Sequence, residues 1–237
     1  MGVLVTALTL VGLAAAAAPG NDAFPGAVIA GASGTTSAMT AEATPETGEP
    51  ALGGVSVWYA WEAPSSATYG FCATPGTAWN SPDTLLGAYT GSGVDALSEV
   101  AFNDDGGWDS RGSFLSIAAS AGTTYHLGVG GFEGSSGPFT LTWKEGECQS
   151  PDTSITQARV KGKKLELWFE GSDDTTPAAD LTFECRLDSG AWAPCTSPVL
   201  LAATAGGPYT GYVRATDANG NVEAFPDSDT RALHGRP

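Results

Sequence analysis

Hydrophobic and polar positions alternate with a period of two through most of the chain after residue 20. In the segment 55–62, for example, Val57, Tyr59 and Trp61 fall on one face. The same alternation recurs in 67–74, 123–130 and 139–144. Such alternation is typical of half-buried strands, and the intervening Gly, Pro, Asn and Asp favour turns. No segment after residue 20 has the helical spacing of apolar residues, so the pattern predicts an all-β, antiparallel sandwich fold.

The charge balance changes near residues 146–153, which suggests a domain boundary. Residues 20–147 hold 14 acids and 2 bases, net −12, whereas residues 148–237 hold 12 acids and 8 bases, net −4. Alternation continues in the second part, and Asp188-Ser189-Gly190 is typical of a hairpin turn between two of its strands. We therefore expect two β-sandwich domains, over 20–147 and 148–237. About 90 residues of short strands suit an immunoglobulin-like second sandwich.

The N-terminus predicts the cellular compartment. Residues 3–18 form an apolar run that ends in small residues before Pro19-Gly20. That pattern is typical of a cleaved signal peptide over 1–18, although the usual positive charges before the run are missing. The run is also short for a transmembrane span, which needs about 20 residues. We expect a secreted protein without a membrane anchor after cleavage.

Composition removes several classes of partner. The chain carries 26 acidic and 10 basic residues, for a net charge of −16. A field of this sign repels phosphate backbones and anionic lipids, so nucleic acids and membrane surfaces are poor partners. Hydrophobic residues make up 42% of the chain, which is sufficient for packed cores. Nothing in the sequence predicts the oligomeric state.

Four cysteines agree with export, because an even number in a secreted chain favours disulfides. Their spacing does not suit a zinc site. The hairpin turn at Asp188 would bring Cys195 beside Cys185, so we expect these two to be bonded. Cys72 alternates onto the outer face of its strand, and Cys148 follows the last strand of the first domain. We expect a second disulfide between them.

Catalytic motifs are not evident. The two histidines are His126, which alternates onto the polar face of a predicted strand, and His234 in the C-terminal tail. We expect His126 to be a surface residue. No Gly-x-Ser-x-Gly or His-Glu-x-x-His motif is present, and no carboxylate pair lies in a glycosidase-like motif. The sequence therefore predicts a protein that is not an enzyme.

Acidic and amide side chains of the first domain gather in three turns. Calcium prefers six to eight oxygen ligands, and it would remove the repulsion between carboxylates in one loop. A solvated acidic loop is the alternative, since Asn and Asp favour turns in any case. If these turns bind calcium, the predicted ligands are Asn21, Asp22, Glu46, Glu49, Asn103, Asp104 and Asp105.

Tryptophans offer a second candidate for binding. Trp79 and Trp108 lie in segments rich in Gly, Asn and Asp, away from the clearest core faces. Exposed Trp side chains suit stacking on sugar rings or on prolines of collagen. The alternative is packing beneath loops, which would also suit Trp58, Trp168 and Trp192. We take Trp79 and Trp108 as the candidate ligand-binding residues.

The first domain resembles the pre-peptidase C-terminal domain family in the order of its motifs. The stretches that carry the resemblance are Asn21–Phe24, Thr44–Pro50, Ser56–Trp61, Asp83–Gly91, Asn103–Asp105, Ala121–Tyr125 and Gly137–Leu141. The resemblance implies a jelly-roll-like sandwich, and some members of the family bind calcium, collagen or other extracellular polymers. One departure is that Gly106-Gly107-Trp108 follows the acidic stretch, where such members often have a cysteine that pairs with the equivalent of Cys72.

The second domain is similar to short bacterial immunoglobulin-like domains, which act as spacers or ligand binders. That resemblance rests on Pro151–Ile155, Phe183–Cys195 and Tyr212–Val222. Taken together, these expectations describe a secreted, non-catalytic adhesion protein that binds an extracellular polymer or a cell-surface ligand. The alternatives are an accessory module of a secreted hydrolase and a structural spacer.

Overall fold

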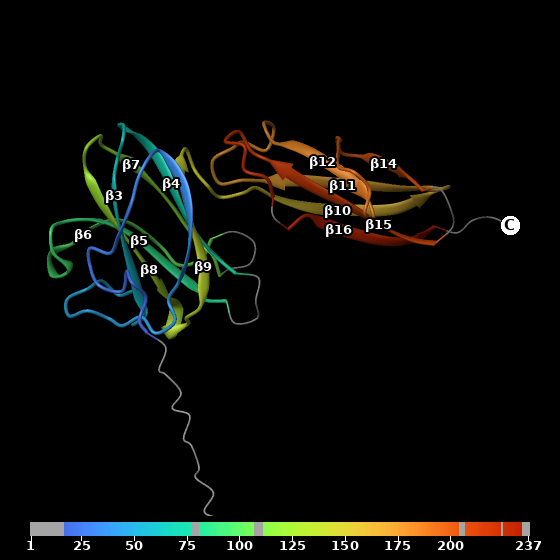
Figure 1. The fold of residues 1–237 in the computed structure, drawn as a ribbon. Coiled ribbons are helices and arrows are strands. Elements are labelled where there is room, and N and C mark those ends of the chain that lie inside the picture. Colours follow the sequence, from blue (N-terminus) through green and yellow to red (C-terminus); the bar gives the residue numbers. More distant parts are fainter. Residues whose placement is uncertain (1–16, 77–80, 107–110, 204–206, 224, 234–237) are drawn as a thin grey trace, which may run out of the picture.

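The computed structural model describes residues 17–76, 81–106, 111–203, 207–223 and 225–233. Most of the expected signal peptide, residues 1–16, lies outside these ranges. The described residues are nearly all β, as predicted, with two short 3₁₀ turns and no α-helix. Figure 1 shows strands β1–β9 in one body and β10–β16 in a second, with one end of the second body beside β4 and β9 of the first. The chain passes from β9 to β10 over residues 146–151.

Two sheets form the first body. One has the strand order β1-β3-β8-β5-β6 and the other β2-β9-β4-β7; every pair is antiparallel except β1 with β3. The strands are β1 (Ala27–Ile29), β2 (Ser33–Met39), β3 (Ser56–Glu62), β4 (Ala67–Pro75), β5 (Thr84–Thr90), β6 (Ser98–Asn103), β7 (Ser113–Ala119), β8 (Thr124–Gly131) and β9 (Pro138–Glu145).

The main core lies between these two sheets, because the apolar face of each strand turns inward. Trp61 is fully buried and packs its ring against Tyr69, Phe71 and Tyr125, at centroid distances of 4.7, 5.2 and 6.0 Å. Its indole N–H donates to the Gly31 carbonyl at 3.0 Å. The predicted inward face of β3 is therefore confirmed.

The outer face of the first sheet is also covered, which corrects the expectation for His126. Leu52, Trp58 and Tyr89 form a second small core there, and Phe24 packs on it from the N-terminal segment. His126 is only 7% exposed, with its ring 4.5 Å from that of Phe24. It is thus a covered residue and not a surface residue, and burial lowers its pKa.

The second body is a smaller sandwich, with sheets in the order β10-β11-β14 and β13-β12-β15-β16. Its core is built from Leu165, Leu167, Phe169, Cys185 and Val213. The strands are β10 (Asp152–Lys161), β11 (Lys164–Ser172), β12 (Thr182–Leu187), β13 (Ala193–Pro194), β14 (Val199–Ala202), β15 (Gly207–Thr216) and β16 (Asp227–Leu233).

Both predicted disulfides are confirmed. Cys185 joins Cys195 across the hairpin of β12 and β13, with a Cα–Cα distance of 5.8 Å. Cys72 of β4 joins Cys148 just after β9, with a Cα–Cα distance of 6.1 Å. Cys72 does lie on the outer face of its sheet, but the segment around Glu147 and Cys148 passes over that face, so Cys72 is buried.

Candidate functional site

Four of the predicted calcium ligands lie together where the N-terminal segment meets the loop before β3. Asp22 accepts hydrogen bonds from the Thr44 amide at 2.7 Å and the Thr44 hydroxyl at 2.9 Å. Glu46 accepts the Phe24 amide at 2.7 Å, and Asn21 donates to the carbonyl of Trp58 at 3.3 Å. These side chains hold the segment that covers the outer face of the first sheet.

Glu49 completes this loop. It accepts the Glu46 amide at 3.0 Å, and both of its carboxylate oxygens lie within 3.0 Å of the Ser56 hydroxyl. Among the described residues, the oxygens of Asp22, Glu46 and Glu49 do not converge as a group of three. Each carboxylate has protein donors, so this loop is held together by its own hydrogen bonds, and calcium there stays a prediction.

The third predicted turn does bring acids together, with an addition from elsewhere in the chain. Asp104 and Asp105 converge with Asp83, and one oxygen of each lies within 4.8 Å of the others. Asn103 donates to the Asp105 carbonyl and accepts the Phe114 amide, both at 2.9 Å. Partial burial, and then the charge of Asp105, raise the pKa of Asp104. Pattern reasoning missed Asp83, because it precedes a different strand.

A second convergence of acids lies where the two bodies meet, and the sequence did not predict it. We name Glu147, Asp173 and Asp217 the junction acids. Their carboxylate oxygens lie within 4.8 Å of one another. Glu147 follows β9, Asp173 follows β11 and Asp217 follows β15, so three strand ends supply one side chain each. Glu147 and Asp217 are only 5% and 7% exposed.

Asparagine side chains surround the junction acids. Glu147 Oε1 accepts from Asn219 Nδ2 at 2.8 Å and from Asn221 Nδ2 at 3.0 Å. Asn221 also donates to Asp217, through its backbone amide and its side chain, both at 2.7 Å. Burial, and then the closeness of Asp217, raise the pKa of Glu147 to about 7, whereas hydrogen bonds lower the pKa of Asp217.

An open cleft of about 580 Å³ runs beside the junction acids, between the two bodies. Apolar side chains of both bodies line it, among them Pro75, Phe114 and Val222. Polar side chains line it as well, and the acidic ones are Asp152, Asp173, Asp174 and Glu223. The cleft therefore combines apolar side chains with acidic ones, and no basic side chain is among the described residues that line it, which suits a neutral or basic ligand.

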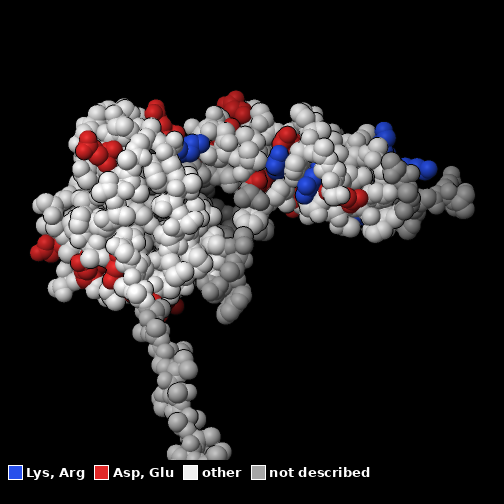
Figure 2. Space-filling view, in the orientation of Figure 1, with Lys and Arg blue, Asp and Glu red and all other residues white. Residues whose placement is uncertain are grey.

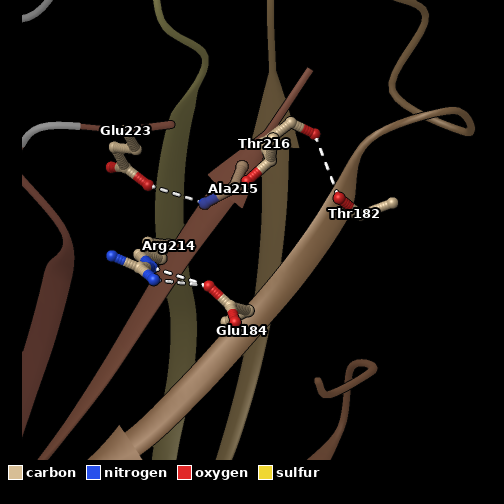
Figure 3. Close-up of polar contacts among 6 residues, drawn as sticks. All are labelled: Thr182, Glu184, Arg214, Ala215, Thr216 and Glu223. Carbon is tan, nitrogen blue, oxygen red and sulfur yellow. Dashed lines mark hydrogen bonds and ion pairs between the residues drawn. The ribbon is translucent and has the colours of Figure 1, made fainter. Parts of the chain in front are cut away.

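Glu223 shows how the cleft wall is held in place. Its carboxylate is buried and accepts from the Ala215 amide at 3.0 Å, as Figure 3 shows, and from the Thr153 amide at 3.1 Å. These bonds tie the segment after β15 to both β15 and β10. Figure 3 also shows Arg214, the residue before Ala215 in β15, which forms an ion pair with Glu184 of β12 at 2.6 Å.

Of the tryptophans considered in the sequence, some are described by the structure and some are not. Trp79 and Trp108, the candidate ligand-binding residues, lie outside the described residues. Trp58 packs beneath the N-terminal segment, as the alternative interpretation expected. Trp192 is half-buried, and its ring contacts the guanidinium groups of Arg186 and Arg214, at 4.5 and 4.3 Å from the ring centroid. Trp192 therefore serves a cation–π stack on the outer face of the second body.

The distribution of charge differs between the two bodies. Figure 2 shows acidic side chains in several patches over the first body, and the basic side chains mostly over the second. None of the helices among the described residues is long and apolar enough to cross a membrane.

No protein-family model matches the chain, and no curated protein sequence matches it. Two solved structures show a weak likeness. One is a β-1,2-glucanase from Parabacteroides distasonis, with 10% identity, a TM-score of 0.23, and coverage of 86% of this chain and 37% of that one. The other is the full extracellular region of zebrafish Gpr126/Adgrg6, with 9% identity, a TM-score of 0.24, and coverage of 85% and 30%. The chain thus spans about a third of each of these proteins.

Proposed function

We propose that this chain is a secreted, non-catalytic binding protein for an extracellular polymer, with a first sandwich stiffened by calcium. The observation that carries the proposal is the open cleft between the two bodies. Its apolar side chains would contact the polymer, and its acidic side chains favour a neutral or basic chain over a sulfated or uronic one. Two disulfides, one closing each body, are in keeping with an oxidising compartment.

The candidate tryptophans lie outside the described residues, but described residues close to them in the sequence line the cleft. Pro75 lies shortly before Trp79, while Gly106 and Gly112 flank the segment that contains Trp108, and all three line the cleft. Stacking of an indole ring on a sugar or a proline would add to the contact that the apolar side chains of the cleft make with the polymer. The resemblance of the first domain to polymer-binding domains supports the same interpretation.

An array of collagens and neutral and acidic glycans would test polymer binding. The variants are Trp79→Ala and Trp108→Ala, and the matched control is Trp192→Ala, whose stack is on the outer face of the second body. We expect the wild type and the control to bind one polymer class, and Trp79→Ala and Trp108→Ala each to bind it about tenfold less tightly. Absence of any bound polymer would favour the spacer, and turnover in a glycosidase or protease panel would contradict a non-catalytic protein.

Calcium stiffening is tested by thermal unfolding of the full chain in calcium or magnesium at equal ionic strength. Calcium at a hundredfold excess over Kd would stabilise the folded state by about 2.7 kcal/mol. General screening of acids would respond equally to both ions. We expect calcium to raise the melting temperature of the first sandwich more than magnesium does. Asp104→Asn should remove this effect of calcium. Equal shifts with both ions would contradict calcium stiffening.

A further inference from the structure

Two buried carboxylate oxygens at the junction have no hydrogen-bond donor. Glu147 Oε2 and Asp173 Oδ1 are both inaccessible to solvent, and neither has a partner among the described residues. Glu147 Oε1 and Asp173 Oδ2 are engaged, the first by Asn219 and Asn221 and the second by the Thr176 amide at 2.7 Å. Each carboxylate is thus held through one oxygen while the other oxygen remains available. Buried charge without a partner is costly, and either a bound cation or a shared proton would offset that cost.

The described basic side chains do not supply a cation. Within the described part of the chain, no ion pair involves any of the junction acids. Lys144 is the nearby base, and its Nζ donates to the Asn219 carbonyl and to Asn221 Oδ1, both at 2.9 Å. It therefore contacts the asparagines that surround the junction acids and not the acids themselves.

We propose that the junction acids bind a calcium ion that fixes the linker to the second sandwich. Three carboxylates within 4.8 Å of one another provide the hard oxygen ligands that calcium takes, with water completing the shell. Neither histidine nor cysteine belongs to this cluster, so the donor set does not suit zinc. Asp173 also lines the open cleft, which gives the ion a route from solvent.

The site joins the segment after β9 to two loops of the second body. Glu147 precedes Cys148, which is anchored to β4 of the first body by its disulfide. Asp173 and Asp217 belong to two loops of the second body. An ion bound by all three would close a bridge between the bodies and hold their relative orientation. This site is distinct from the acidic turns of the first sandwich, and polymer binding plays no part in the inference.

Isothermal titration of the full chain with calcium chloride, after removal of metals with EDTA, tests the site. Glu147→Gln preserves the shape of the side chain and its contact with the asparagines. The matched control is Asp104→Asn, in the acidic group of the first body. We expect Glu147→Gln to weaken one calcium-binding event by about tenfold or more, with Asp104→Asn leaving that event unchanged. Absence of any event sensitive to Glu147→Gln, up to millimolar calcium, would overturn the proposal.

Small-angle X-ray scattering provides a second readout. Calcium should narrow the distribution of interdomain distances of the wild type and not that of Glu147→Gln. The competing arrangement is a proton shared between Glu147 and Asp217. The amide introduced by Glu147→Gln would replace that proton as a donor. Calcium would then leave the scattering of both proteins unchanged and would shift their melting temperatures equally. That result would overturn the cation site, whereas the first-body control would still report on calcium stiffening there.

Discussion

Removal of the Cys72–Cys148 disulfide should destabilise the first sandwich more than removal of Cys185–Cys195 destabilises the second. The two bonds close loops with sequence separations of 76 and 10. In the chain-entropy treatment, losing them costs about 4.5 and about 2.8 kcal/mol, respectively. The difference arises in the unfolded chain, because the longer loop regains more conformational freedom when its bond is absent.

The assay is urea denaturation of Cys72→Ala/Cys148→Ala and Cys185→Ala/Cys195→Ala, followed by tryptophan fluorescence and far-UV circular dichroism. With an m-value of about 2 kcal/mol/M, the first variant should shift the midpoint of its sandwich by about 2 M. The second should shift the other transition by about 1.4 M. A loss below about 1 kcal/mol in the first variant, or equal losses in both, would refute the loop-length reasoning.

Three further variants test the packing. Trp61→Ala removes a fully buried ring and should cost about 3–5 kcal/mol by urea denaturation; a loss near that of an exposed residue would contradict the core assignment. Gly53→Ala should lower the melting temperature by several degrees, because Gly53 has φ +79° and an added Cβ would lie 1.8 Å from the Gly131 carbonyl oxygen. Glu223→Gln should lower the free energy of unfolding by about 1–3 kcal/mol, because the new side-chain amide group would face the backbone amide of Thr153 or Ala215. An unchanged free energy of unfolding would show that neither hydrogen bond contributes to stability.

Local patterns predicted the strands well, because alternation reports directly which positions share a face of a sheet. Val57, Tyr59 and Trp61 are accordingly buried together. The hairpin turn predicted the Cys185–Cys195 bond for a similar reason, since both cysteines lie close to the same turn. These are short-range features, and the sequence contains all that is needed to infer them.

Alternation could not predict what covers the other face of a sheet. His126 lies on the polar side of β8, yet the N-terminal segment crosses that side and buries it. The junction acids were missed for the same physical reason. Glu147, Asp173 and Asp217 follow three different strands, and only the arrangement of the two bodies brings their carboxylates together. Asp83 joins Asp104 and Asp105 through an equally long-range contact.

The short segment after β9 connects several of these features. Gly146 forms a bridge with Tyr69 of β4, and an added Cβ there would lie 2.5 Å from Asn219 Oδ1 of the second body. A glycine with φ +83° thus permits the close approach that places Glu147 beside Asn219. The segment is held to β4 by a disulfide and to the second body by the asparagines, so it acts as a fixed joint.

The joint also shapes the cleft, because Cys148, Asp173 and Asn221 line it. An ion at the junction acids and a polymer in the cleft would then depend on the same arrangement of the two bodies. If that arrangement is the one that binds polymer, calcium at the junction must tighten polymer binding, and polymer must tighten calcium binding by the same factor. Glu147→Gln should remove this coupling while leaving the cleft side chains in place. Equal polymer affinity with and without calcium in the wild type would show that the two sites act independently.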